Sequence, residues 1–180
     1  MKVSRSGVVY ALSAVVILLA GCQSKSSTES TPAVNTVAQA NEAATRRMME
    51  GIQNGDTTVV DSLVAESFVE HQTMPGLAPD RAGLKAFITQ WHAAFPDLQM
   101  KVNNMTADSS YVWVYSTMSG TMKGPLMGMK PTGKSFQIDA FDLIRIENAK
   151  CVEHWGAMND AAMMTQLGLG APPAGGKKRS

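Results

Sequence analysis

The feature of this sequence that most restricts its fold is a change in hydrophobic periodicity after Pro96. Before this residue, apolar side chains recur at the three- and four-residue spacing of helices, predicted at about 36–54, 57–66 and 80–95. A short extended segment at 68–71 precedes the third of these helices. After Pro96 the pattern is that of strands, predicted at about 99–105, 111–122, 135–146 and 151–157. A short last helix is predicted to start at Asn159-Asp160.

This order of elements, α-α-β-α-β-β-β-β-α, is typical of an α+β domain in which a curved antiparallel sheet wraps around helices as a cone. The loop at 71–79, which is rich in turn residues, is expected at the rim of the open mouth. Apolar hollows with a few convergent polar groups are the usual sites of small-molecule binding. The fold therefore predicts a small apolar ligand or substrate, held by a wall that the many methionines make adaptable.

The N-terminus carries the signature of an exported protein. Lys2 and Arg5 precede an apolar run of about a dozen residues, and Leu19-Ala20-Gly21-Cys22 resembles the lipobox of bacterial lipoproteins. A membrane-spanning helix needs about 20 apolar residues, so the run is too short to span. We expect residues 1–21 to be a signal peptide and Cys22 to carry the lipid, such as palmitate, that anchors the protein. The alternative is an ordinary secretory signal that ends in a cysteine by chance.

The predicted organisation after the signal peptide has three parts. Residues 22–34 are rich in Ser and Thr and should form a flexible tether. Residues 35–169 form the domain, and residues 170–180 a disordered basic tail whose cations keep it soluble or contact an anionic surface. In Gram-negative bacteria, Gln23 after the lipidated cysteine would by resemblance place the protein in the outer membrane, facing the periplasm.

Composition excludes several classes of function. The formal net charge is +1, and removing residues 1–21 lowers the Lys and Arg count from 16 to 14 against 15 acids, which argues against nucleic acid as a partner. With Cys22 lipidated, Cys151 would have no disulfide partner. The sequence has no Cys/His cluster of the zinc type, no phosphate-binding glycine loop and no G-x-S-x-G motif. These absences predict cofactor-free chemistry without a metal, or plain binding.

Short motifs follow one another in a fixed order along the domain: His71-Gln72, Gly76, Phe95-Pro96-Asp97, Gly120-Thr121, Gly124, Pro131-Thr132-Gly133-Lys134, Glu153-His154-Trp155 and Gln166-Leu167-Gly168. This ordered set resembles the SnoaL-like polyketide cyclases, also called ester cyclases, of the nuclear transport factor 2-like superfamily. The resemblance covers about residues 41–169. It implies the cone-shaped fold described above.

The resemblance also implies a cofactor-free ring closure, in which an aspartate near the last strand and helix is the acid/base of an intramolecular aldol condensation. A dry pocket suits such a carboxyl group because it raises the pKa toward the working pH. The family aspartate stands four residues after the tryptophan and seven before the glutamine, and both counts from Trp155 and Gln166 reach Asn159. Asp160 follows one place later, and Met122 stands where the family has a histidine. Asp160 and Asn159 could equally serve as helix-capping residues.

Two further candidates lie in the predicted strands. His154 titrates near neutral pH, which suits proton transfer. Because strand side chains alternate, Glu153 and Trp155 share one face, and if Trp155 lines the cavity, His154 is expected to face outward. Asp142 has apolar neighbours on its own face, so its carboxyl group is either in an apolar environment that excludes water or paired with a cation across the sheet.

The remaining candidates are ligand-contacting residues. His71, beside the rim loop, could orient a ligand, whereas Trp91 and Trp113 are more often packing or cavity wall. The complete prediction assigns acid/base roles to Asp160, Asp142 and His154, and substrate contacts to His71, Trp91, Trp113, Glu153, Trp155 and Asn159.

Two functional hypotheses follow. The leading one is an envelope-anchored enzyme of the cyclase or isomerase kind that shifts protons on a small apolar carbonyl compound. The alternative is a module that binds a hydrophobic small molecule, or dimerises, without catalysis. A carboxylate of Asp160, Asp142 or Glu153 that faces an apolar cavity would favour the enzyme. Bulky side chains on both faces of the strand at 111–116 also predict a homodimer through the outer face of the sheet.

Overall fold

The computed structural model describes residues 32–72 and 74–170, and it confirms the predicted α+β class. Four helices and five strands follow one another in the order α1 (Pro32–Asn54), α2 (Thr58–Leu63), β1 (Val64–Glu70), α3 (Arg81–Ala94), β2 (Gln99–Ala107), β3 (Tyr111–Thr121), β4 (Ser135–Glu147), β5 (Lys150–Met158) and α4 (Asp160–Gln166). None of the helices within these residues has the length and hydropathy needed to cross a membrane.

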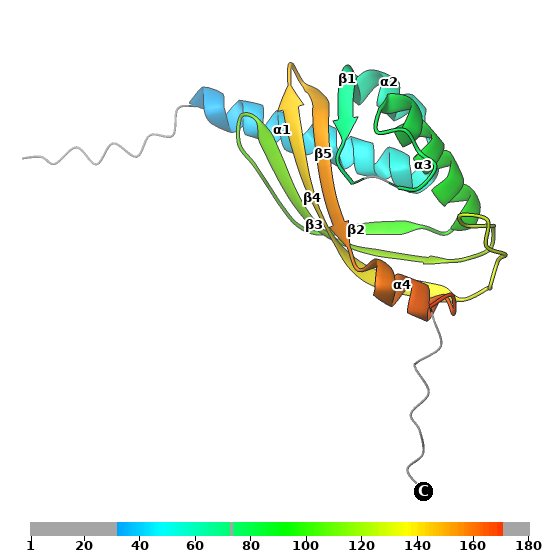
Figure 1. Ribbon diagram of the computed structural model, residues 1–180. Coiled ribbons are helices and arrows are strands. Elements are labelled where there is room, and N and C mark those ends of the chain that lie inside the picture. Colours follow the sequence, from blue (N-terminus) through cyan, green and yellow to red (C-terminus); the bar gives the residue numbers. More distant parts are fainter. Residues whose placement is uncertain (1–31, 73, 171–180) are drawn as a thin grey trace, which may run out of the picture.

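The five strands form one curved sheet in the order β1-β5-β4-β3-β2. Strands β2 to β5 are an antiparallel meander, whereas β1 pairs in parallel with β5. Figure 1 shows the long strands bending so that one face of the sheet surrounds α1, α2 and α3, while α4 lies near the far end of β4. The sheet therefore has an inner face toward the three helices and an outer face away from them.

Local sequence signals explain where the later elements begin and end. The Asp80 side chain accepts a hydrogen bond from the Gly83 amide (2.9 Å) and so caps α3, which ends just before Phe95-Pro96. Asn159 caps α4 in the same way, through the Ala162 amide (3.0 Å). The β4–β5 hairpin turns through Asn148 and Ala149, both at positive φ, as a two-residue turn of this handedness requires.

The predicted boundaries fail at two places. Residues 64–66 were expected to end the second helix but belong to β1, because Val64 is fully buried where it pairs with Cys151 of β5. The first helix begins at Pro32, ahead of the predicted residue 36. The proposed signal peptide, Cys22, most of the tether and all but the first residue of the basic tail lie outside the described residues.

Apolar packing leaves the centre of the cone partly open. An aromatic cluster at the α4 end of the sheet contains Trp91, Phe95 and Phe136, whose rings contact one another edge to face or tilted. A second group, around Val60 and Phe68, packs α2 and β1 against α3. Between these groups, the inner face of the sheet and helices α1 and α3 enclose a cavity.

Candidate active site

The cavity is the apolar hollow that the sequence predicts. Its volume is about 130 Å³, counted as the space open to the centre of a water-sized sphere. One water molecule needs roughly 10–15 Å³ on this measure, so the cavity is several times larger. Its wall is mainly aliphatic, aromatic and methionine side chains, among them Met48, Phe68, Met74, Leu84, Phe87, Trp91 and Met118. The loop between β1 and α3 contributes to the wall, as expected of a rim loop. A small apolar guest therefore fits the size and the chemistry of this space.

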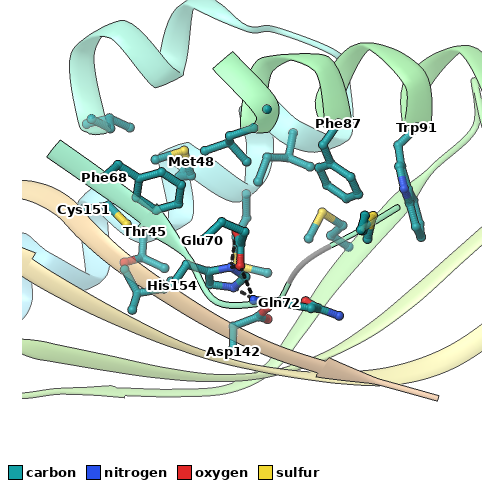
Figure 2. Close-up of a pocket in the computed structure, with 18 of the residues that line it drawn as sticks. Thr45, Met48, Phe68, Glu70, Gln72, Phe87, Trp91, Asp142, Cys151 and His154 are labelled. Carbon is teal, nitrogen blue, oxygen red and sulfur yellow. Dashed lines mark hydrogen bonds and ion pairs between the residues drawn. The ribbon is translucent and has the colours of Figure 1, made fainter. Parts of the chain in front are cut away.

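Three ionisable side chains converge on the cavity, Glu70 from β1, Asp142 from β4 and His154 from β5. We call them the polar triad (Figure 2). Strand register brings them together, because Glu70 pairs with His154 across the parallel β1–β5 ladder. Asp142 pairs with Gly156, two residues beyond His154 and therefore on the same face of the sheet. Residues 84 positions apart in sequence thus meet through backbone pairing.

Both ring nitrogens of His154 are engaged. Nδ1 lies 2.9 and 2.8 Å from the two carboxylate oxygens of Glu70, and Nε2 lies 3.1 Å from Oδ1 of Asp142. Burial alone would lower the pKa of the imidazole, but the hydrogen bonds and charges of Asp142 and Glu70 outweigh it and raise the pKa to about 9. At neutral pH His154 is therefore an imidazolium that donates one hydrogen bond to each carboxylate.

The two carboxylates are not equivalent. Both oxygens of Glu70 contact His154, and Oε1 also accepts the backbone N–H of Gln72 at 2.8 Å. Asp142 contacts His154 through Oδ1, and its Oδ2 accepts no hydrogen bond from the described residues. Both oxygens of Glu70 are thus engaged, whereas Asp142, which lines the cavity, has one oxygen without a partner among the described residues.

Cys151, on β5, also lines the cavity and lies near Phe68 in Figure 2. Burial raises the pKa of its thiol to about 12, and Sγ lies 3.6 Å from the carbonyl oxygen of Glu153 as a weak donor. A thiol that stays protonated at neutral pH is a poor nucleophile. Cys151 is therefore part of the wall and not a reacting group.

Of the predicted site residues, the structure brings Asp142, His154 and Trp91 to the cavity. The expectation that His154 faces outward is wrong, because Trp155 takes the outer face instead. There the ring of Trp155 stacks on that of His71, with centroids 4.3 Å apart, and His71 Nε2 lies 2.8 Å from Glu153.

The other candidates lie away from the cavity lining. Asp160 and Asn159 are exposed at the start of α4, where Asn159 is the cap and Asp160 stands in the first turn. Trp113 is on the outer face and 57% exposed. Glu153 is also outside, where hydrogen bonds from His71 and then Arg145 hold the pKa of its carboxyl group below the usual range. Their predicted roles in chemistry or ligand contact remain predictions.

Sequence reasoning missed Glu70 and Gly156. Glu70 precedes His71-Gln72 at the end of a strand and beside the rim loop, a position where a charged side chain can reach a cavity. Gly156 interrupts a run of strand formers, and glycine inside a strand often marks a close approach by another group. Within the described residues, no group of three or more His, Cys, Asp or Glu side chains has the arrangement of a metal site.

Comparison with known proteins gives a consistent picture. A family model described as SnoaL-like polyketide cyclase matches residues 42–167. No curated protein sequence matches the chain significantly.

Three solved structures illustrate the range of proteins that share this fold. TsrD from Streptomyces laurentii has a TM-score of 0.66 at 21% identity, over 73% of this chain and 96% of that one. IdmH, a candidate polyketide cyclase from Streptomyces antibioticus, has a TM-score of 0.62 at 26% identity, over 71% and 98%. AclR, a candidate hydroxylase from Streptomyces galilaeus, has a TM-score of 0.65 at 24% identity, over 76% and 89%.

The raised pKa of His154 predicts how stability depends on pH. A group whose pKa is higher in the folded state stabilises the fold fully below its unfolded pKa, here 6.5, and that stabilisation is lost as the pH rises through about 9. We expect the free energy of unfolding to fall by up to about 3 kcal/mol over this interval. Denaturant unfolding between pH 6 and 10 measures it, with His154→Gln as the control that lacks the effect. Equal pH dependence of the two proteins would contradict the assignment.

Proposed function

Because the chain belongs to the SnoaL-like polyketide cyclase family, whose model matches residues 42–167, we propose that it is a cofactor-free cyclase or isomerase acting on a small apolar carbonyl compound. The observation that carries this proposal is the Asp142 side chain, which lines an apolar cavity and has one oxygen held by His154 and the other without a partner among the described residues. A carboxylate presented to a carbon next to a carbonyl is the arrangement that general-base catalysis requires.

The proposed step is a proton transfer. Oδ2 of Asp142 takes a proton from the carbon next to the carbonyl group. The electron pair of that C–H bond forms a carbon–carbon double bond, and the carbonyl π electrons move to oxygen, which gives an enolate. In an isomerisation, Asp142 returns the proton to a different carbon. In a ring closure, the enolate carbon bonds to a second carbonyl carbon of the same molecule, and the oxygen of that carbonyl receives the proton.

His154 acts through Asp142 in this scheme and is a positioning residue. Both its N–H groups are committed to carboxylates, so it does not itself abstract a proton. Its hydrogen bond to Oδ1 fixes the orientation of the Asp142 carboxylate and leaves Oδ2 without a partner among the described residues. Glu70 in turn provides the second negative charge that retains the imidazolium in an apolar setting. The scheme assigns to Asp142 the role that the family pattern, counted along the sequence, would place at Asn159 or Asp160.

Enolate formation can be measured directly. We expect the protein to catalyse exchange of the α-hydrogens of 2-tetralone in D₂O, and Asp142→Asn to lose about 100-fold or more of that rate, since general-base catalysis contributes about 10²–10⁴-fold. Proton NMR follows the exchange. Asp139→Asn, an exposed carboxylate on the same strand, is the matched control.

The Asp160→Asn variant separates the two placements of the base. If its rate falls as far as that of Asp142→Asn, the carboxylate one place after the position counted from the family motif is essential after all. Binding of 2-tetralone without any exchange would instead favour the alternative of a non-catalytic module that captures hydrophobic molecules.

We also propose that the protein acts at the cell envelope, anchored by lipid on Cys22. The support is the sequence Leu19-Ala20-Gly21-Cys22 after a short apolar run. We expect the full-length chain expressed in a Gram-negative host to sediment with the membranes, and Cys22→Ser to leave them, because no acyl chain can then be attached. Immunoblotting of membrane and supernatant fractions measures this, and an unchanged distribution of Cys22→Ser would refute the anchor.

The outer face of the sheet supports the proposal of a homodimer. Trp113 and Phe141 are 57% and 55% exposed, and the Phe141 ring stacks on Tyr115 with centroids 4.9 Å apart. Leu143 lies between Trp113 and Trp155 in the ladder, so large apolar side chains form one continuous patch over β3, β4 and β5. Such patches on a sheet suit face-to-face packing, and a second copy of the chain offers a surface of the same shape and charge.

The dimer has a simple test. We expect residues 32–180 to sediment as a dimer at micromolar concentration, and Trp113→Arg to shift the protein to monomer, because a buried unpaired charge would oppose the interface. Val37→Arg replaces an exposed apolar residue of α1, away from the patch, and should leave the dimer intact. A wild-type monomer in analytical ultracentrifugation would exclude this assembly.

A further inference from the structure

Gln72 follows β1 on the inner side of the sheet, and strand register determines where its side chain lies. Glu70 pairs with His154 in parallel, and the His71 amide donates to the His154 carbonyl at 2.9 Å. Continuing this register by two residues brings Gln72 opposite Gly156. His71, between them, points to the outer face and stacks there on Trp155. Alternation therefore turns Gln72 inward, and its side chain lines the cavity.

Gly156 leaves the space that the Gln72 side chain occupies. A Cβ atom placed on Gly156 would lie 2.0 Å from Oε1 and 2.9 Å from Cδ of Gln72, distances that no real contact allows. Any residue other than glycine would thus push the amide out of its place. This gives a physical reason for a glycine in the middle of β5, where a side chain would otherwise add to packing.

The position of the Gln72 amide at Gly156 is also next to Asp142, the proposed base. Gly156 pairs directly with Asp142 across the antiparallel β4–β5 ladder. Directly opposed Cβ positions are about 4.5–5.5 Å apart. The Gln72 amide overlaps the Cβ position of Gly156, with Oε1 2.0 Å from it, so the amide lies about one such distance from the Asp142 side chain. Figure 2 shows the two side chains beside each other below His154. A carbonyl oxygen and its neighbouring carbon can bridge a gap of this size.

The orientation of the amide presents its donor to the cavity. The Cβ position at Gly156 is 2.0 Å from Oε1 of Gln72 and 3.1 Å from Cε1 of His154, so the amide oxygen and the positively charged ring lie next to the same point. The NH₂ group is at the other end of the amide, farther from Gly156 than Oε1 is. The Gln72 backbone is itself fixed, since its N–H donates to Glu70. A neutral donor held in place near a base is the arrangement that stabilises a developing oxyanion.

We infer that Gln72, seated on Gly156, binds the carbonyl oxygen of the substrate and stabilises the enolate that Asp142 forms. This inference deepens the proposed function and rests on it for the reaction, but the binding contact can be tested without turnover. As Asp142 removes the proton, charge moves onto the carbonyl oxygen, and the Gln72 N–H donates to that oxygen throughout. The substrate is thus a ketone or ester whose remaining surface is apolar.

The first test uses binding alone. 2-Naphthol has the shape of the enol of 2-tetralone, and naphthalene has the same ring system without oxygen. We expect Gln72→Met, which keeps the length of the side chain and removes the donor, to weaken 2-naphthol binding about tenfold, the worth of one hydrogen bond to a partly charged oxygen. Naphthalene binding should change by less than about twofold. Fluorescence titration measures both, and equal changes for the two ligands overturn the inference.

The second test uses Gly156. Gly156→Ala removes no chemical group, yet it should slow 2-tetralone exchange as much as Gln72→Ala does, about 100-fold, because it displaces the amide. Once Gln72 is alanine, the close neighbour that remains is Cε1 of His154 at 3.1 Å, which needs to shift by only a few tenths of an ångström. Adding Gly156→Ala to Gln72→Ala should therefore have little further effect. If the two losses multiply instead, Gly156 does not act by seating Gln72. Circular dichroism and unfolding of each variant report whether the fold is intact.

The outcomes distinguish this inference from the proposed function. If the wild type catalyses exchange and the Gln72 variants match it, the inference fails and the enzyme proposal stands. If no exchange occurs but 2-naphthol binding depends on Gln72, the contact stands and the enzyme proposal fails. Failure of 2-naphthol to bind the wild type overturns the inference directly.

Discussion

A charged imidazole inside an apolar cavity is the constraint on which the rest of this structure depends. Removing an imidazolium from water costs several kcal/mol, and the structure offsets this by placing a carboxylate at each ring nitrogen of His154. The three groups come from β1, β5 and β4, so the same contacts that keep the charge also hold these strands in register. Loss of any member would leave a buried charge without compensation, and the edge strand β1 would lose a main attachment to the sheet.

The two faces of the sheet separate two kinds of chemistry. On the inner face, Glu70, Asp142 and His154 lie within an otherwise apolar wall, where electrostatic interactions are strong. On the outer face, His71, Glu153 and Arg145 form a partly exposed network beside stacked aromatic rings. Neighbouring residues therefore have opposite surroundings, since His154 faces the cavity whereas Glu153 and Trp155 do not. Adjacent residues of β5 point to opposite faces of the sheet, so one lines the cavity and the next lies on the outer surface.

Membership of the SnoaL-like family does not by itself locate the chemistry. Proteins of this fold include both candidate cyclases and a candidate hydroxylase, as fold and function are only loosely coupled. In this chain the family position near the last helix holds Asn159, whose side chain is engaged in capping α4. Asp142, on the inner face of β4, has the free carboxylate oxygen and the apolar surroundings. The proposed base is consequently a strand residue held by a neighbouring strand.

The sequence alone determined the elements and the class of the fold, because helical and strand periodicity, the Asp80 and Asn159 caps and the Glu147–Lys150 hairpin are local properties. It also indicated an apolar hollow, and it predicted that the Asp142 carboxylate either lies in an apolar environment that excludes water or pairs with a cation. Only the tertiary structure decided which face of β5 lines the hollow, that Glu70 completes the polar triad and that Gly156 makes room for Gln72. These facts depend on the parallel pairing of β1 with β5, a contact between segments more than eighty residues apart that no local pattern encodes.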